Sequence, residues 1–193
     1  PDFITVALLA DGQSAKDSEG NDITVTLTPD TWSAEVGNLP AKKNGNTIAY
    51  SWDEVNVPAG YTSVISGDAN ATITNTYGAT GSMTLNGTKH MSGRPFVDGD
   101  SYTFTVSATN GAPLPENQSV TITPTSGTDA TFSFGAINYT LANVGKTYTY
   151  TVTETGNRAG VTNDTPKTVT VTIADNGNGT LSVVRAASGS DSS

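Results

Sequence analysis

Residues 147–154 read TYTYTVTE, and this stretch indicates the fold class of the whole chain. Aromatic and β-branched residues alternate with threonines at a period of two, which is the pattern of a strand with one buried face. Tyr148, Tyr150 and Val152 share that face, and the next residue on it is Glu154. The stretch therefore predicts a β-strand that carries a carboxyl group in line with its aromatic core residues.

Three other predicted strands also place one polar side chain among core residues. Counting by two along each strand gives these core faces: Trp52 followed by Glu54, Ile73 followed by Asn75, and Met83, Leu85, Lys89 and Met91. A buried ammonium, carboxylate or unpaired amide is costly, by several kcal/mol for an ion. Two interpretations are open: each residue lies at a strand end where the core meets water, or the residues act together.

Turn dipeptides separate short alternating runs along the chain, and no segment has a helical period. The predicted strands are Ile4–Leu9, Ile23–Thr28, Trp32–Val36, Ile48–Val55, Thr62–Ile65, Ala71–Tyr77, Met83–Met91, Tyr102–Ala108, Val120–Thr123, Thr131–Phe134, Thr147–Glu154, Thr168–Ile173 and Thr180–Val184. The small-residue segment 78–81 (GATG) predicts a boundary between two all-β sandwich domains, residues 1–78 and 79–193. Asp175–Gly179 predicts a tight hairpin rather than a calcium loop, because the spaced acidic ligands and closing glutamate are missing.

The composition narrows the classes of function. Acidic residues outnumber basic ones by 18 to 9, the formal net charge is −9, and no basic cluster is present, so we expect no nucleic-acid binding. No apolar stretch approaches the ~20 residues of a membrane span. A signal peptide is missing, so we expect a mature or excised segment. With no cysteine, the chain must rely on core packing or on a covalent bond other than a disulfide.

Other chemistry has little support in the residues. His90 alternates onto the outer face of its strand without a cysteine partner, so we expect a surface residue, and neither a metal nor a cofactor. Trp52 shares the core face of its strand, whereas Trp32 could pack in the core or stack on a sugar. Phe96 and Trp32 are candidate exposed aromatics, and the irregular stretch Ala112–Asn117 is the first candidate for ligand binding.

The inward-facing amine, carboxyl groups and amide have one joint explanation, an intramolecular isopeptide bond between a lysine and an asparagine. Burial favours the neutral amine, which is nucleophilic. Burial also favours the protonated carboxylic acid, which can polarise the amide carbonyl and pass a proton to departing ammonia. The fold keeps the partners together, so proximity is supplied in advance. Such a bond would take the place of the missing disulfide.

The first half resembles a CnaB-type domain of Gram-positive surface proteins over nearly all of residues 1–78. The resemblance rests on TVALLADGQ (5–13), TVTLTPDTWSAEVGNLP (24–40), IAYSWDEVNVPAGYT (48–62) and ATITNTY (71–77). It implies that Asn75 is the acceptor of an isopeptide bond and Glu54 the acid that promotes it. The family's first strand, with its lysine, would precede Pro1. Candidate substitutes within the chain are poor because they lie in predicted turns: Lys16, Lys42 and Lys43.

The second half resembles the isopeptide-linkage domain of streptococcal-type major pilins over residues 82–185. The resemblance rests on GTKHMSGRPFVDGDSYTFTV (87–106), FSFGAINYT (132–140), GKTYTYTVTETGNRAGVTND (145–164) and TVTVTIADNGNGTLSV (168–183). It implies that Lys89 is the nucleophile and Glu154 the promoting acid. The last strand, with its acceptor asparagine, would follow Ser193, since Asn176 and Asn178 fit a hairpin better.

Together the two resemblances imply two tandem Ig-like (CnaB-type) β-sandwiches, each missing a terminal strand in this chain. The expected function is a structural module of a Gram-positive surface pilus or adhesin stalk, stabilised by self-formed Lys–Asn isopeptide bonds, with no enzymatic action on external substrates. Its expected partners are neighbouring domains or pilin subunits of the same fibre, and its expected location is the cell surface. The alternative is an adhesin module that binds a host ligand or a carbohydrate.

Overall fold

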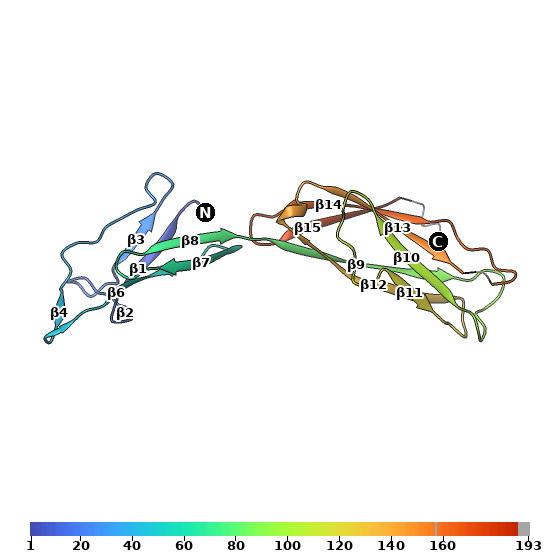
Figure 1. Cartoon of the computed structure of the whole chain (residues 1–193), viewed down its shortest axis with the longest axis horizontal. Coiled ribbons are helices and arrows are strands. Elements are labelled where there is room, and N and C mark those ends of the chain that lie inside the picture. Colours follow the sequence, from blue (N-terminus) through green and yellow to red (C-terminus); the bar gives the residue numbers. More distant parts are fainter. Residues whose placement is uncertain (157, 189–193) are drawn as a thin grey trace. The chain divides into compact units, whose positions relative to one another are not determined.

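The computed structural model describes residues 1–156 and 158–188, and strands make up most of it (Figure 1). The chain divides into two compact units, Pro1–Gly78 and Ala79–Ser193. The prediction of an all-β chain is confirmed: the described residues contain no α-helix and a single 3₁₀ turn, η1 (Leu141–Asn143). Threonine, valine and tyrosine dominate the strands because their side chains suit a pleated surface with one buried face.

The first unit contains one four-stranded sheet and two separate hairpins. Its strands are β1 (Ile4–Ala10), β2 (Gln13–Ser14), β3 (Thr24–Leu27), β4 (Lys42–Lys43), β5 (Asn46–Thr47), β6 (Tyr50–Val55), β7 (Tyr61–Ser66) and β8 (Thr72–Tyr77). Strand β1 pairs antiparallel with β2, β3 and β6, while β4–β5 and β7–β8 form separate hairpins. The core of this unit is small, with Ile4, Val6 and Leu8 of β1 at its centre.

The strand predicted at Trp32–Val36 is wrong, because these residues pair with no described strand. A tight turn precedes them, in which the Thr31 amide donates to the Thr28 carbonyl at 3.0 Å, and the chain then leaves the sheet. Trp32 remains 48% exposed, so the alternation that suggested a strand does not correspond to a buried face here.

The second unit has two layers (Figure 1). Its strands are β9 (Thr80–His90), β10 (Tyr102–Ala108), β11 (Ser119–Ile122), β12 (Asp129–Thr140), β13 (Thr147–Thr155), β14 (Lys167–Asp175) and β15 (Leu181–Ser188). One layer is the sheet β11-β10-β13-β14-β15, and the other is the pair β12-β9. The predicted hairpin at Asp175–Gly179 is confirmed, since β14 and β15 pair antiparallel on either side of it.

Tyrosines fill the core of the second unit, and two of them are joined through their hydroxyl groups. Tyr139 and Tyr150 are fully buried, their hydroxyls lie 2.9 Å apart, and the Tyr150 hydroxyl donates to the Pro113 carbonyl at 2.8 Å. Burial raises the pKa of both phenols above the usual value, so both stay protonated. The bond to Pro113 fixes the loop Ala112–Asn117 to the core, and Pro115 in this loop is itself buried.

Strand β12 is longer than the predicted Thr131–Phe134 because it contains a bulge. The register with β9 shifts between Ser133 and Gly135, and Gly135 has a φ of 88°, which glycine adopts without strain. The shift lets Phe134 on one side and Ile137 on the other face the same core. A strict period of two ends at the bulge, and the prediction therefore stopped there.

Candidate functional site

Lys89 and Glu154 form an ion pair inside the second unit. Strand β9 carries Lys89 and β13 carries Glu154, and the ammonium nitrogen Nζ lies 2.9 Å from Oε1 and donates to Oε2 at 3.1 Å. The two side chains are only 8% and 5% exposed. The alternation of each strand placed both residues on the core face; the structure adds that they meet, although 65 residues separate them.

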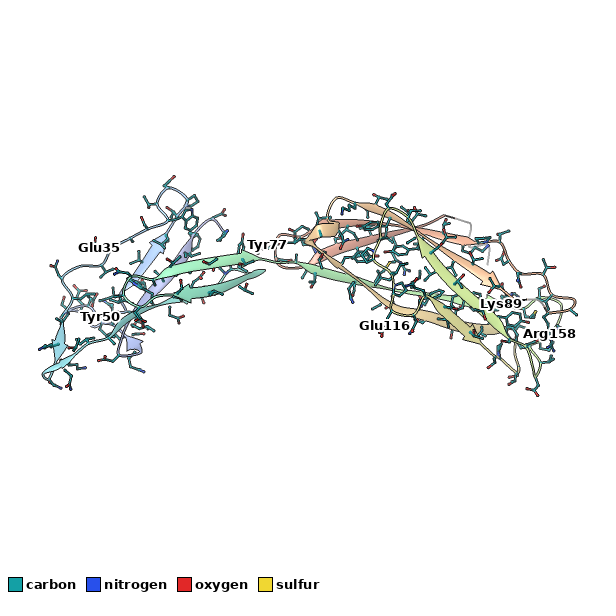
Figure 2. All side chains as sticks on the ribbon, in the orientation of Figure 1. Glu35, Tyr50, Tyr77, Lys89, Glu116 and Arg158 are labelled. Carbon is teal, nitrogen blue, oxygen red and sulfur yellow. The ribbon has the colours of Figure 1, made fainter. Side chains whose placement is uncertain are left out.

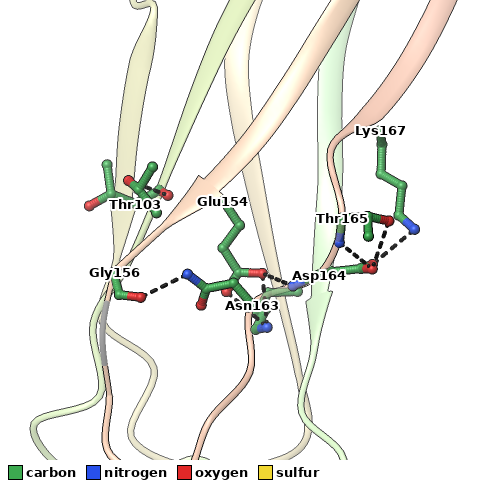
Figure 3. Close-up of polar contacts among 9 residues, drawn as sticks. Thr103, Glu154, Gly156, Asn163, Asp164, Thr165 and Lys167 are labelled. Carbon is green, nitrogen blue, oxygen red and sulfur yellow. Dashed lines mark hydrogen bonds and ion pairs between the residues drawn. The ribbon is translucent and has the colours of Figure 1, made fainter.

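Two further groups complete the surroundings of this pair. The Asp164 amide donates to Glu154 Oε2 at 3.3 Å, and Figure 3 shows this contact at the end of β13. The ring of Tyr102, on β10, lies with its centre 5.1 Å from Lys89 Nζ, within range of a cation–π interaction. Lys89 thus contacts both a carboxylate and an aromatic face, which hold its amine at one point in space.

A cavity of about 870 Å³ opens beside the pair. Phe104, Phe132 and Val152 form its apolar wall, while Lys89 and Glu154 lie at its polar end. The rings of Phe104 and Phe132 stack at 3.8 Å, and Phe132 also covers Gly87 so closely that a Cβ atom there would lie 2.6 Å from the ring. Gly87 is required because its missing side chain leaves room for this aromatic wall.

Glu54 and Asn75 meet in the first unit. Glu54 on β6 is 8% exposed and accepts a hydrogen bond at 3.0 Å from the Asn75 amide nitrogen and one at 2.5 Å from the Ser63 hydroxyl. Among the described residues, no lysine or arginine pairs with this carboxylate, and Asn75 Oδ1 is buried without a hydrogen-bond donor. The described part of the unit therefore holds a carboxyl group with no cation beside it and an amide carbonyl with no hydrogen-bond donor.

A groove of about 410 Å³ leads to Asn75. Ile4 and Val6 of β1, Leu27 of β3 and Ile73 of β8 give it apolar walls, so it lies between the sheet and the β7–β8 hairpin. Trp32 also lines it. The groove thus combines apolar walls with the unpaired Oδ1 of Asn75.

The other predicted candidates take no part in the two polar clusters, although His90 lines the cavity beside Lys89. His90 is exposed and pairs with Asp129 at 2.8 Å, Trp52 donates to the Ala69 carbonyl, and Phe96 is buried against Tyr102, so the expectation of an exposed Phe96 is wrong. The three lysines set aside in the sequence are all exposed, with Lys16 paired to Asp22 and Lys42 and Lys43 in the β4–β5 hairpin. Asn176 donates to the Thr180 hydroxyl within its hairpin, where Asn178 accepts from the same residue.

Sequence reasoning did not single out three of the residues now found around the sites. Ser63 could have been noticed, because it alternates with Tyr61 and Ile65 on the inner face of β7. Tyr102 was placed on a strand, but nothing local indicates that its ring contacts Lys89. Asp100 is a buried carboxylate that pairs with Arg94 and Arg158. Nothing in the sequence indicated this, because the two arginines belong to different loops.

No group of three or more histidine and carboxylate side chains in residues 1–156 and 158–188 is arranged to hold a metal ion. In the same part of the chain, no helix is long and apolar enough to span a membrane.

Comparisons with known proteins give two family matches. The model of the Spy0128-like isopeptide containing domain matches residues 85–192, more than half of the chain, and the model of the Cna protein B-type domain matches residues 1–76. Among solved structures, the chain is similar to a single B repeat unit (B1) of the collagen binding surface protein of Staphylococcus aureus, at 20% identity and a TM-score of 0.33, over 98% of this chain and 89% of that one. A structure of two B repeat units of that protein is 14% identical, with a TM-score of 0.35, over 97% of this chain and 70% of that one. A search of curated proteins found no match.

Proposed function

Since the chain belongs to the Spy0128-like isopeptide containing domain family, and a Cna protein B-type domain precedes that domain, we propose that it is a structural module of a Gram-positive surface pilus or adhesin stalk. The observation that carries the proposal is the buried Lys89–Glu154 pair beside an open cavity. A buried ion pair is a weak source of stability, because desolvation offsets most of the attraction. A reactive role accounts for it better.

The proposed reaction in the second unit is the formation of a Lys–Asn isopeptide bond. Lys89 Nζ attacks the side-chain carbonyl carbon of an asparagine, the new C–N bond replaces the amide's own C–N bond, and ammonia leaves with the proton that Nζ gives up. Glu154, within hydrogen-bond reach of Nζ, takes that proton and delivers it to the leaving nitrogen.

The acceptor asparagine of the second unit is proposed to come from residues beyond Ser193, on a strand that fills the cavity of about 870 Å³. Among the described strands, β9 forms a ladder with β12 alone. At the start of its other edge Thr80 bridges to Thr180 and the Thr84 carbonyl accepts from Arg185, so a further strand is proposed to join β9 beyond Thr84. The polar end of the cavity would then bring the asparagine to Lys89 and Glu154.

In the first unit the proposed roles are reversed. Asn75 is the acceptor and Glu54 the promoting acid, and the lysine is proposed to come from residues before Pro1 that occupy the groove next to Asn75. Two observations on the described residues support this proposal: Asn75 Oδ1 is unpaired, and no cation lies beside Glu54. A lysine would supply a hydrogen-bond donor to the first and a positive charge to the second. After the reaction, Glu54 would keep a hydrogen bond to the new amide.

A stalk needs resistance to pulling, and this chemistry provides it. A covalent bond between the first and last strands of a sandwich prevents a pulling force on the termini from separating the strands one by one. The chain would then act only on itself, at the cell surface, with neighbouring domains or subunits of one fibre as its partners. The exposed Trp32 beside the first groove favours the alternative, a ligand-binding adhesin module.

The test measures the intact mass of a longer chain that includes the strands on both sides. We expect it to be lighter than its sequence mass by one ammonia for each unit. Glu154→Gln and Glu54→Gln should each restore one ammonia, whereas the control Glu116→Gln, at an exposed loop residue, should restore none (Figure 2). The 193-residue chain alone should keep its full mass. A longer chain of full mass would refute the proposed chemistry.

A further inference from the structure

Asp100 is a buried acid that the proposed cross-linking chemistry does not use. It lies in the connection 91–101 between β9 and β10, and its side chain is fully buried. The Arg94 guanidinium donates to both of its oxygens, at 2.7 and 2.9 Å, and the Val97 amide donates at 3.0 Å. This bidentate pair fixes the connection that begins directly after Lys89 and His90.

A second arginine extends the contact to another part of the chain. Arg158 Nε lies 3.2 Å from Asp100 Oδ1, and its Nη1 donates to the Gly99 carbonyl at 2.9 Å. Arg158 belongs to the connection between β13 and β14, which begins just after Glu154. Asp100, Arg94 and Arg158, here called the Asp100 clasp, thus join the connections that follow the two residues of the buried pair.

Both connections line the cavity beside Lys89. Residues 91–94 of the first and 160–165 of the second form part of its wall, and Figure 2 shows Lys89 and Arg158 at the same end of the unit. The second connection also supplies the Asp164 amide that donates to Glu154 Oε2. The path of this connection therefore decides whether Glu154 keeps that donor.

The clasp also fixes the start of β10. Tyr102, two residues after Asp100, holds its ring 5.1 Å from Lys89 Nζ. Asp100 thus lies two residues before Tyr102, which contacts Lys89. Through Arg158 it is also bonded to the connection whose Asp164 amide donates to Glu154. Stability alone does not require such an arrangement, because a buried ion cluster is often no more stabilising than apolar residues of equal volume.

The clasp is ionised at neutral pH. The hydrogen bonds from Arg94 and from the Val97 amide lower the pKa of Asp100 to about 2, and Asp100 in turn raises the pKa of Arg94. The charged or titratable groups facing Asp100 are Arg94, Arg158 and, beyond Arg94, the Tyr102 phenol.

We infer that Asp100 is a positioning residue for the cross-link: through Arg94 and Arg158 it holds the two connections against Lys89 and Glu154, which keeps both groups aligned and limits the access of water to them. This inference rests on the proposed function for the cross-link itself. The shielding of Lys89, however, is a property of the 193-residue chain and can be measured without any cross-link.

The first experiment measures how fast an amine-reactive acetylating reagent modifies Lys89 in the 193-residue chain, with the exposed Lys42 as an internal reference. Arg158→Ala releases the second connection but leaves the Arg94–Asp100 pair intact, so the fold is kept. We expect Lys89 to react roughly tenfold faster or more, the factor for losing a charge-assisted hydrogen bond. The NMR signal of the Asp164 amide should shift as well.

The matched control is Arg185→Ala, which removes another arginine bond to a backbone carbonyl, that of Thr84, in the same unit. It should leave Lys89 protected, and Arg158→Lys, which keeps the charge but not the paired contacts, should restore the protection only in part. An unchanged rate for Lys89 and an unchanged Asp164 signal in Arg158→Ala would overturn the inference.

The second experiment follows ammonia loss over time in the longer chain. If the wild type loses ammonia from the second unit and Arg158→Ala does so at least roughly tenfold more slowly, both proposals stand. Equal rates would overturn the positioning role while leaving the cross-link intact. If the wild type loses no ammonia there, the cross-link proposal fails, and the Lys89 protection still decides whether the clasp shields Lys89.

Discussion

Replacing Lys89 alone should destabilise the second unit far more than replacing Lys89 and Glu154 together. Lys89→Met keeps the unbranched stem of the side chain and removes the ammonium that lies 2.9 Å and 3.1 Å from the two oxygens of Glu154. The carboxylate then stays in a site where its side chain is 5% exposed, with the Asp164 amide as its remaining donor at 3.3 Å. An unpaired ion is left in a place that water barely reaches.

The exposure of the pair sets the magnitude. At 8% and 5% exposure, solvent screening is slight, so the cost of removing one partner should lie in the range of about 3–5 kcal/mol measured for buried pairs. For a unit of this size that loss lowers the melting temperature by roughly 10–20 °C. Changing both residues, to methionine and leucine, removes the two desolvation costs together and should be within about 1 kcal/mol of the wild type.

The assay is thermal unfolding of the 193-residue chain, which carries no cross-link under the proposal. Both tryptophans, Trp32 and Trp52, lie in the first unit, so their fluorescence reports that unit as an internal control. The near-ultraviolet dichroism of the buried tyrosines follows the second unit. Lys146→Met, at an exposed lysine of the second unit, should change little. The single variants are Lys89→Met and Glu154→Leu. If their losses add in the double variant, or if either loss is below about 1 kcal/mol, the pair behaves as a surface ion pair.

Three further changes test other parts of the structure. Gly87→Ala should destabilise the second unit by about 1–3 kcal/mol, because the ring of Phe132 is held between Gly87 and Phe104 and cannot move away. The midpoint of denaturant unfolding should show this loss. The control Gly37→Ala, at a glycine with open space around it, should show none. Asp100 has a folded pKa below its unfolded value, so its contribution is complete above about pH 4 and is lost as the pH falls towards about 2; Asp100→Asn should therefore lower the melting temperature at neutral pH and converge with the wild type near pH 2. In single-molecule stretching of the longer chain, Lys89→Ala should make only the second unit extensible; equal contour-length gains in wild type and variant would mean that Lys89 ties nothing.

The sequence by itself determined the fold class and the direction of the main side chains. Alternation at a period of two is a local property of the backbone, so it could be counted correctly for Lys89, Glu54 and Glu154 without knowledge of any neighbour. The same counting failed where the backbone departs from that period, as at the Gly135 bulge, or where no partner strand exists, as after Trp32.

Only the tertiary structure decided which of these side chains meet. Lys89 reaches Glu154 across 65 residues, and Arg158 reaches Gly99 across 59, through strand pairings and loop paths that no local pattern encodes. Such contacts depend on which strands become neighbours, and therefore on the packing free energy of the whole unit rather than on the preferences of any segment. For this reason the inward orientation of these side chains could be predicted from the sequence, whereas the Asp100 clasp depends on two connections that only the tertiary structure brings together.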